Sequence, residues 1–134
     1  MPSVDDCQII TLPKVASDRG SLSFVEANGS IPFDIKRIYT TYDIPTDAVR
    51  GGHSHIEQHE LVIAVNGSFE IELDDGKHKK TIFLRKAYEG LHIVPGMWRE
   101  LKNFSSGSVV LVMASDVYKE SDYIRDYELF RKNR

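Results

Sequence analysis

An all-β sandwich or barrel is the fold class that this sequence predicts, and three observations support it. Short runs rich in β-branched and aromatic residues recur along the chain, with clusters of turn-forming residues between them. Several runs alternate apolar and polar residues, which is typical of strands with one buried face. No long helical period appears before residue 119. Because neither a linker nor a repeat interrupts the series, we expect one domain over residues 1–134.

The first part of the chain contains three expected strands, at 7–12, 21–24 and 31–42. The first ends at Pro13, and in the second Leu22 and Phe24 alternate with serines. Turn residues separate these strands at 17–20 and 28–30, and a loop follows at 44–47.

The later part continues the same pattern up to residue 114. In the run 69–73 the apolar residues share one face, and Asp74-Asp75-Gly76 follows as a strong hairpin signal. Further strands are expected at 61–65, 81–84, 90–94, 97–101 and 109–114.

The C-terminal residues change character. Ser121 is a candidate N-cap, and Tyr123, Tyr127 and Phe130 recur at helical spacing. We therefore expect a short helix at about 121–132, packed on the barrel.

Composition restricts the class of protein. With 134 residues, 41% of them hydrophobic and 28% charged, the chain can bury a substantial core. A formal net charge of -3 gives no support for nucleic-acid binding. The one cysteine, Cys7, cannot form an internal disulfide, which favours a reducing compartment. No signal peptide is visible, and no apolar run approaches the roughly 20 residues of a membrane span, so we expect a cytoplasmic protein without a membrane partner.

The centre of the chain carries the pattern on which the functional prediction depends. His53 and His55 are two residues apart, and in a strand such residues point to the same face. Gly51-Gly52 precedes them and an apolar run follows, as at the polar end of an apolar barrel. Imidazole titrates with a pKa of roughly 6.5, so the pair is a candidate for proton transfer or for metal ligation. The alternative is two partly exposed histidines at the start of a strand.

Five further side chains are candidates for substrate contacts. Tyr39 could donate a hydrogen bond to a developing oxyanion, although an ordinary cross-strand aromatic is the simpler interpretation of its residue type. Trp98 could stack on a base or a sugar, and a core position is equally consistent with its type. Phosphate could be bound by planar guanidinium groups, which are otherwise solvated surface charges, and the candidates are Arg37, Arg50 and Arg99.

A metal site is a separate possibility. The two histidines followed by His59 and Glu60 resemble the first half of a cupin metal site, which normally takes a further histidine from the second half of the barrel. Around 95–100 this chain supplies Arg99 instead, and a cation there disfavours a second cation. His92 stays open as a ligand, but we expect no metal and no other cofactor.

A set of motifs runs in order along nearly the whole chain, at 19–22, 31–39, 50–55, 66–68, 73–76, 90–91, 95, 98, 114–116 and 122–127. A single His-x-His motif is weak evidence, but this ordered set is specific. It resembles the sugar 3,4-ketoisomerases that act on dTDP-4-keto-6-deoxyglucose, a small family of cupins.

This resemblance implies a cupin jelly-roll fold and a metal-independent shift of a keto group from C4 to C3 in deoxy-amino-sugar biosynthesis. The partner would be a dTDP-linked 4-keto-6-deoxy sugar. His53 and His55 match the family's active-site histidines, Tyr39 its tyrosine and Arg50 its arginine. The family also implies a homodimer that exchanges N-terminal strands. Exposed strand edges are usually paired or covered, so we expect four apolar residues in that interface: Ile9, Leu12, Leu22 and Phe24.

The residues fit this chemistry independently of the resemblance. Moving a ketone between adjacent carbons requires removal of a proton next to the carbonyl, an enediol, and reprotonation of the neighbouring carbon. Two groups that titrate near neutrality can transfer these protons, and a tyrosine or arginine can stabilise the enediolate.

We therefore predict an isomerase, a nucleotide-sugar 3,4-ketoisomerase. The alternatives are a metal-dependent cupin enzyme and a non-catalytic sugar-binding cupin. A deoxysugar epimerase, which pairs one histidine with an aspartate, is disfavoured by the paired histidines.

Overall fold

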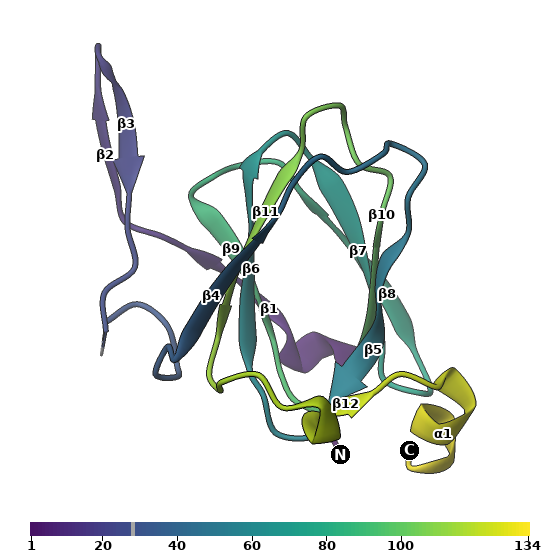
Figure 1. The fold of residues 1–134 in the computed structure, drawn as a ribbon. Coiled ribbons are helices and arrows are strands. Elements are labelled where there is room, and N and C mark those ends of the chain that lie inside the picture. Colours follow the sequence, from purple (N-terminus) through teal and green to yellow (C-terminus); the bar gives the residue numbers. More distant parts are fainter. Residues whose placement is uncertain (28) are drawn as a thin grey trace.

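Two antiparallel sheets face each other around an apolar core in the computed structural model, which describes residues 1–27 and 29–134 (Figure 1). Within these residues one sheet has the strand order β1-β9-β6-β11-β4 and the other β12-β5-β10-β7-β8. This is a jelly-roll arrangement, so the predicted all-β fold is confirmed. The turn expected at 28–30 includes Asn28, which lies outside the described residues.

The bounds of the elements are as follows. The first sheet contains β1 (Gln8–Thr11), β4 (Arg37–Thr41), β6 (Glu60–Asn66), β9 (Glu89–Ile93) and β11 (Val109–Ala114). The second contains β5 (Arg50–His55), β7 (Phe69–Asp74), β8 (Lys79–Leu84), β10 (Trp98–Lys102) and β12 (Tyr123–Ile124). The remaining elements are the hairpin β2 (Lys14–Ser17) and β3 (Gly20–Ser23), the 3-10 turns η1 (Val4–Asp6) and η2 (Glu120–Asp122), and the helix α1 (Tyr127–Lys132).

Burial along β6 explains why its apolar residues form a continuous run. Val62 and Ala64 point between the two sheets and belong to the main core. Leu61 and Ile63 point outward, where a second cluster with Leu12 covers them. Because both faces of this strand are covered, it does not alternate as β7 does, where only one face is fully buried.

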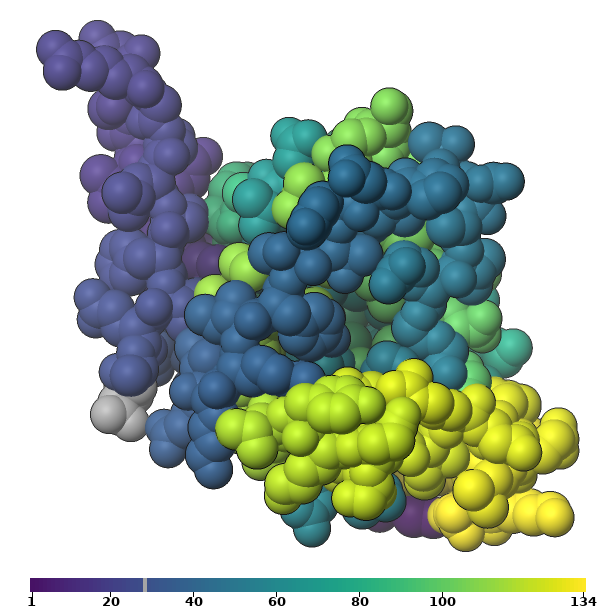
Figure 2. Space-filling model, viewed as in Figure 1, coloured from purple at the N-terminus to yellow at the C-terminus, as the bar shows by residue number. Residues whose placement is uncertain are grey.

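The β2–β3 hairpin stands away from the barrel (Figures 1 and 2). Its two strands pair with each other, and within the described ranges neither joins one of the large sheets. Val15 and Leu22 on this hairpin are 60% and 58% exposed. Leu12, just before the hairpin, is buried in its own chain. The expectation that Leu12 lies in a subunit interface is therefore corrected, since its own chain already covers it, whereas Leu22 is exposed.

The C-terminal helix is shorter than predicted. Its N-cap is Asp126, whose side chain accepts hydrogen bonds from two backbone N–H groups of the first helical turn. The prediction was wrong for residues 121–126, because Tyr123 pairs with His55 in a short strand that gives the backbone other partners. No helix in the described part of the chain has the length and apolar character to cross a membrane.

Candidate active site

A cavity of about 340 Å³ lies between the two sheets. Its walls come from both sheets and from the segment 118–125. Apolar side chains from β6, β9, β10 and β11 line part of it, as is usual for small-molecule sites. Of the side chains predicted to carry function, five line this cavity: Arg37, Tyr39, Arg50, His53 and Arg99. His55 and Trp98 lie outside its lining.

The backbone of β5 fixes where the histidines point. Gly51 has a φ of 78°, a left-handed conformation that other residues rarely adopt, and an added Cβ would lie 3.3 Å from a methyl group of Leu101. The pairing of β5 with β10 shifts register close to this point. Beyond the irregularity, His53 stands opposite Arg99. The glycine therefore permits the close approach that brings this histidine into the cavity wall.

His53 presents an unpartnered ring nitrogen at the cavity wall. Its Nε2 atom is buried and has no hydrogen-bond partner among the residues that the structure describes. Burial lowers the pKa of His53 to about 2, and the positive charge of Arg99 acts in the same direction. The imidazole is therefore neutral at physiological pH. A neutral ring with a free nitrogen at a cavity wall can take a proton from a bound substrate.

Glu60 is the centre of a buried polar network. One carboxylate oxygen accepts a hydrogen bond from Arg99, and the other accepts from the Tyr39 hydroxyl and the Gln58 amide, each at 3.0 Å. Glu60 and Arg99 are only 1% and 2% exposed. Burial raises the pKa of Glu60, but Arg99 and the other partners outweigh it, so the net shift is downward. The pair is therefore ionised.

The network keeps Tyr39 protonated. Burial, and then the negative charge of Glu60, raise the pKa of Tyr39 well above its usual value. The hydroxyl of this cavity-lining residue thus keeps its proton, which it donates to Glu60 in the unliganded site. This geometry favours the oxyanion-stabilising interpretation over that of an ordinary cross-strand aromatic.

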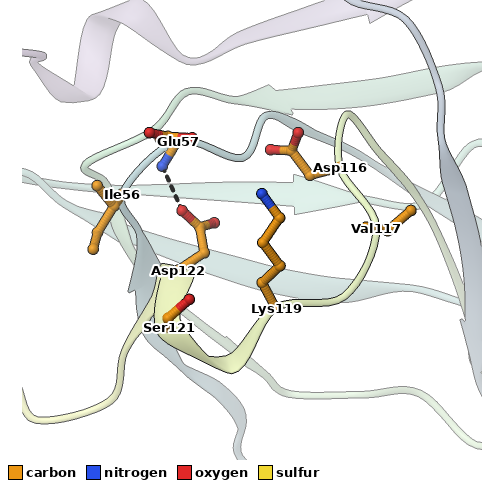
Figure 3. A pocket seen from close by; sticks show the side chains of 7 residues that line it. All are labelled: Ile56, Glu57, Asp116, Val117, Lys119, Ser121 and Asp122. Carbon is orange, nitrogen blue, oxygen red and sulfur yellow. Dashed lines mark hydrogen bonds between the residues drawn. The ribbon is translucent and has the colours of Figure 1, made fainter.

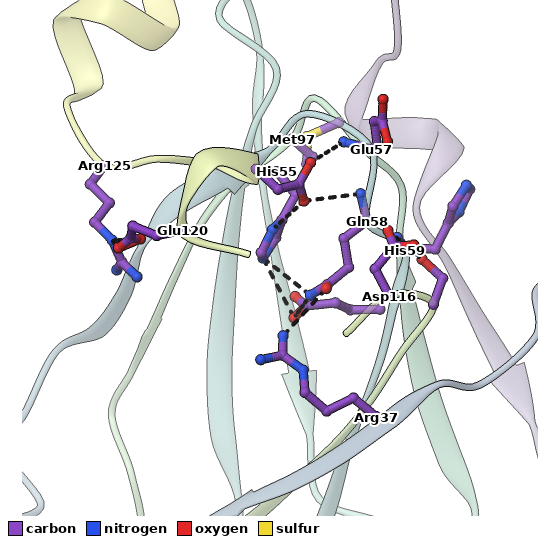
Figure 4. Close-up of polar contacts among 12 residues, drawn as sticks. Arg37, His55, Glu57, Gln58, His59, Met97, Asp116, Glu120 and Arg125 are labelled. Carbon is purple, nitrogen blue, oxygen red and sulfur yellow. Dashed lines mark hydrogen bonds and ion pairs between the residues drawn. The ribbon is translucent and has the colours of Figure 1, made fainter. Parts of the chain in front are cut away.

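His55 lies behind the cavity and is fully buried. Its Nδ1 atom is 3.0 Å from the Asp122 carboxylate, and its Nε2 atom is 3.4 Å from the Gln58 amide nitrogen (Figure 4). The Asp122 oxygen is an acceptor and the Gln58 amide nitrogen a donor, so this arrangement assigns the proton to Nδ1 and makes Nε2 the acceptor. One of the two histidines therefore does have an aspartate partner, and the histidine pair alone does not separate a ketoisomerase from an epimerase.

The site does not fit a metal ion, although three potential ligands converge. The ligand atoms of His53, His55 and Glu60 lie within 4.8 Å of one another. However, both oxygens of Glu60 already accept hydrogen bonds, and the Arg99 guanidinium sits beside them. A metal cation would be repelled by Arg99 and would have to displace it. The chemistry of the site therefore belongs to its own side chains.

His92 does not reach this site. It pairs with Leu61, whose side chain points away from the main core, and its Nε2 atom is 3.0 Å from His59 Nδ1. Phe33 stacks on the His59 ring. Both histidines thus lie on the outer side of the first sheet, and neither adds a fourth ligand to His53, His55 and Glu60.

Known proteins are similar to this chain in sequence and in fold. The family model FdtA, described as WxcM-like, C-terminal, matches residues 5–134. The chain belongs to this family. A curated relative from Aneurinibacillus thermoaerophilus, TDP-4-oxo-6-deoxy-alpha-D-glucose-3,4-oxoisomerase, is 41% identical over 125 residues, which are 93% of this chain and 90% of the relative.

Two solved structures are also similar. A 3,4-ketoisomerase from Helicobacter canadensis is 45% identical with a TM-score of 0.92, and 96% of each chain is covered. A mutant of the 3,4-ketoisomerase QdtA from Thermoanaerobacterium thermosaccharolyticum, in complex with TDP-4-keto-6-deoxyglucose, is 37% identical with a TM-score of 0.95, and the match covers 98% of this chain and 95% of that one. The predicted family, jelly-roll fold and enzyme class, a sugar 3,4-ketoisomerase, are confirmed.

Trp98 occupies a different place in this FdtA-family chain from the one predicted for a substrate contact. It is 6% exposed and packs against two aromatic side chains of α1, Tyr127 at 5.3 Å and Phe130 at 5.6 Å between ring centroids. Its indole thus joins the helix to the barrel, which favours the core interpretation.

Sequence reasoning missed several residues of the site. Asp122 was assigned to a helix, although it is the partner of His55 and lies 67 residues away in the sequence. Tyr118, Tyr123 and Arg125 line the cavity from the same segment. The motif at 122–127 was part of the resemblance, and that was the available signal. Glu60 was considered only as a metal ligand.

Proposed function

We propose that this chain converts dTDP-4-keto-6-deoxyglucose to the 3-keto isomer, with His53 as the base. The observation that carries the proposal is the neutral, unpartnered nitrogen of His53 in a cavity that Tyr39 also lines. The name of the curated relative and the sugar bound to the QdtA mutant support the choice of substrate.

The reaction needs two carbon–proton steps and two oxygen–proton steps. His53 removes the proton from C3, the electron pair forms a C3–C4 double bond, and the C4 oxygen takes up a proton to give an enediol. The C3 hydroxyl then loses its proton as the C3 ketone forms, and C4 takes up a proton. No atom or electron is lost. The Tyr39 hydroxyl donates to Glu60 in the unliganded site, and by turning its proton toward the substrate it would stabilise the oxygen on which negative charge develops.

The arginines have different roles in this proposal. The charge of Arg99 is matched by Glu60, so we assign it to the buried network and not to phosphate binding. Arg37 stands beside the Tyr39 ring and its Nε atom is buried without a partner in the described ranges. Arg50 is exposed at the cavity wall. Both suit the pyrophosphate of a nucleotide sugar.

The test is incubation of the purified protein with dTDP-4-keto-6-deoxyglucose, with the products followed by NMR. We expect the C3 proton to be replaced by deuterium in D₂O and a 3-keto sugar to accumulate. Activity should survive removal of metals by chelation, which a metal-dependent cupin would not tolerate. Binding of the sugar nucleotide without any conversion or exchange would instead support a non-catalytic sugar-binding cupin.

We also infer a homodimer in which the N-terminal hairpin reaches a second subunit. The hairpin projects from the barrel (Figure 2). Exposed apolar residues lie on it, Val15 and Leu22, and directly after it, Phe24. An apolar groove of about 240 Å³ lies between the hairpin and the outer face of the first sheet. Exposed apolar surface on an isolated hairpin is costly, and pairing with a symmetry-related copy would remove it.

A further inference from the structure

Two histidines lie together on the outer side of the first sheet, and neither lines the active-site cavity. His92 is on β9, and His59 comes directly before β6. Leu61 of β6 stands opposite His92, so His59 is the diagonal neighbour of His92 on the same face of the sheet. His59 Nδ1 lies 3.0 Å from His92 Nε2, and the two rings are 20° from parallel. The reaction proposed above uses neither side chain.

The fold holds this pair in place. The His59 N–H donates to Ser115 Oγ at 2.8 Å, and the His59 carbonyl accepts from the Ser115 N–H at 3.0 Å. His92 lies on a strand that pairs with β1 on one side and with β6 on the other. Phe33 packs against both imidazoles, with ring centroids 5.7 Å and 5.6 Å away. The two nitrogens are therefore brought together by fixed backbone and a common aromatic neighbour.

The charges around the pair favour a cation, in contrast to those of the active site. Burial lowers the pKa of both imidazoles, that of His92 to about 4, so neither ring has to lose a proton at neutral pH before it binds a metal. Among the described residues, the charge that acts on His59 is that of the Asp116 carboxylate, whereas Arg99 stands beside the converging ligands of the active site. Asp116 lines a cavity of about 220 Å³, which gives its carboxylate room to turn (Figure 3).

The separation of the two nitrogens suits a shared metal ion. Two nitrogens bound at about 2.1 Å to one ion lie about 3.0–3.4 Å apart, between a right angle and the tetrahedral angle. The observed 3.0 Å falls at the lower end of this range. Without a metal, one ring donates an N–H to the other. When the ion binds, that proton moves to the outer nitrogen of the same ring, and both rings tilt so that their lone pairs point at the ion. The step takes up and releases no proton.

We propose that His59 and His92 form a binding site for a divalent late transition-metal ion such as Zn²⁺, with water in the remaining coordination positions. Imidazole nitrogens are preferred ligands of such ions. The ion joins the start of β6 to β9 next to Phe33, so its role is structural. This inference does not rest on the proposed ketoisomerisation, and the active site described above keeps its metal-free chemistry.

Calorimetric titration of the full chain with Zn²⁺, after treatment with a chelator and its removal, is the primary test. We expect the wild type to bind one ion per chain. His59→Phe and His92→Phe each keep a ring against Phe33 but remove a ligand atom. Loss of a group that only supports a ligand weakens metal binding by about 10–100-fold, so loss of a ligand should weaken it at least as much. The matched control is His78→Phe, at a histidine 77% exposed, which should bind Zn²⁺ as the wild type does.

A second control separates this pair from the active site. His53→Asn removes one of the three converging ligands there and leaves the outer pair intact, so it should keep the wild-type affinity for Zn²⁺. Electron paramagnetic resonance with Cu²⁺ reports the ligands directly, and we expect coupling to two imidazole nitrogens in the wild type. No binding by the wild type, or binding that survives in both His59→Phe and His92→Phe, would overturn the proposal and leave an ordinary hydrogen bond between two imidazoles. Neither result depends on turnover, so failure of this site and failure of the proposed ketoisomerisation are distinguishable.

Discussion

At the residue scale, the site depends on one neutral histidine whose free nitrogen has no partner in the described structure. Burying a nitrogen without a hydrogen-bond partner costs free energy, so this atom is a candidate to pair with a bound ligand. A charged imidazole at this place would be repelled by Arg99 and could not accept a proton. Burial and Arg99 thus keep His53 neutral before the substrate arrives, although the same lowering of its pKa makes the unliganded imidazole a weaker base.

We predict that His53→Asn lowers kcat by roughly 10²–10⁴-fold, the usual contribution of a general base, without loss of fold. Asparagine retains polarity but cannot take up the C3 proton. Steady-state kinetics and circular dichroism provide the measurement. The control is His78→Asn, because His78 is 77% exposed and distant from the chemistry. Near-normal turnover by a folded His53→Asn protein would refute the assignment of the base.

At the scale of elements, sequence patterns correctly predicted the strands and turns that depend only on neighbouring residues. The alternation in β7 and the turn after it follow from neighbouring residues, and both were read correctly from the sequence. The strand β12 was not predictable in this way, because it exists only through pairing with β5. Its residue Tyr123 pairs with His55, which lies 68 residues earlier in the sequence. Without that contact, the spacing of aromatic residues from 123 to 130 favours a helix.

In the active site, too, the sequence did not reveal roles that depend on contacts between residues far apart in the chain. Tyr39, His53 and the arginines could be named from motifs and from the resemblance. The role of Glu60 could not, because a carboxylate near two histidines suggests a metal ligand until Arg99 is seen beside it. Trp98 was ambiguous because only the position of α1 decides whether its ring is covered.

The cap of α1 gives a prediction at this scale. Asp126→Ala should lower the free energy of unfolding by about 1 kcal/mol, since two backbone N–H groups of the first turn lose their acceptor. Urea denaturation measures it. Ser121→Ala is the matched control, because Ser121 was the cap expected from sequence and lies outside the observed helix. An equal or larger loss for Ser121→Ala would contradict the observed boundary.

At the scale of the whole molecule, buried neutral histidines link stability to pH. Burial lowers the pKa of His92 to about 4 and that of His53 to about 2, whereas an unfolded histidine titrates at roughly 6.5. Between these values the unfolded chain binds more protons than the folded one. The stability of the protein must therefore decrease as pH falls below about 6.5.

We predict lower urea midpoints at about pH 5 than at about pH 7.5, and a smaller difference in the variant His92→Asn, which removes one of the groups that gain a proton on unfolding. The His78→Asn control, at an exposed position, should show the wild-type difference. A midpoint that is independent of pH, or one that rises in acid, would show that these histidines are already protonated in the folded state.

The quaternary structure gives the last prediction. Leu22 and Phe24 are 58% and 39% exposed at the end of a hairpin that projects from the barrel, so they contribute little to the chain's own core. If a second subunit covers them, Leu22→Asp with Phe24→Asp places two charges in an apolar interface, which is strongly unfavourable.

We expect sedimentation to give the wild type twice the 15.2 kDa mass of one chain, and the double variant to be monomeric or aggregated. Phe83→Asp, at a residue 54% exposed on β8, should remain dimeric. Deletion of residues 1–14 should cause aggregation, because it removes β1 from the first sheet as well as the first residue of β2. A well-folded, active monomer of the intact chain at micromolar concentration would contradict the exchanged dimer.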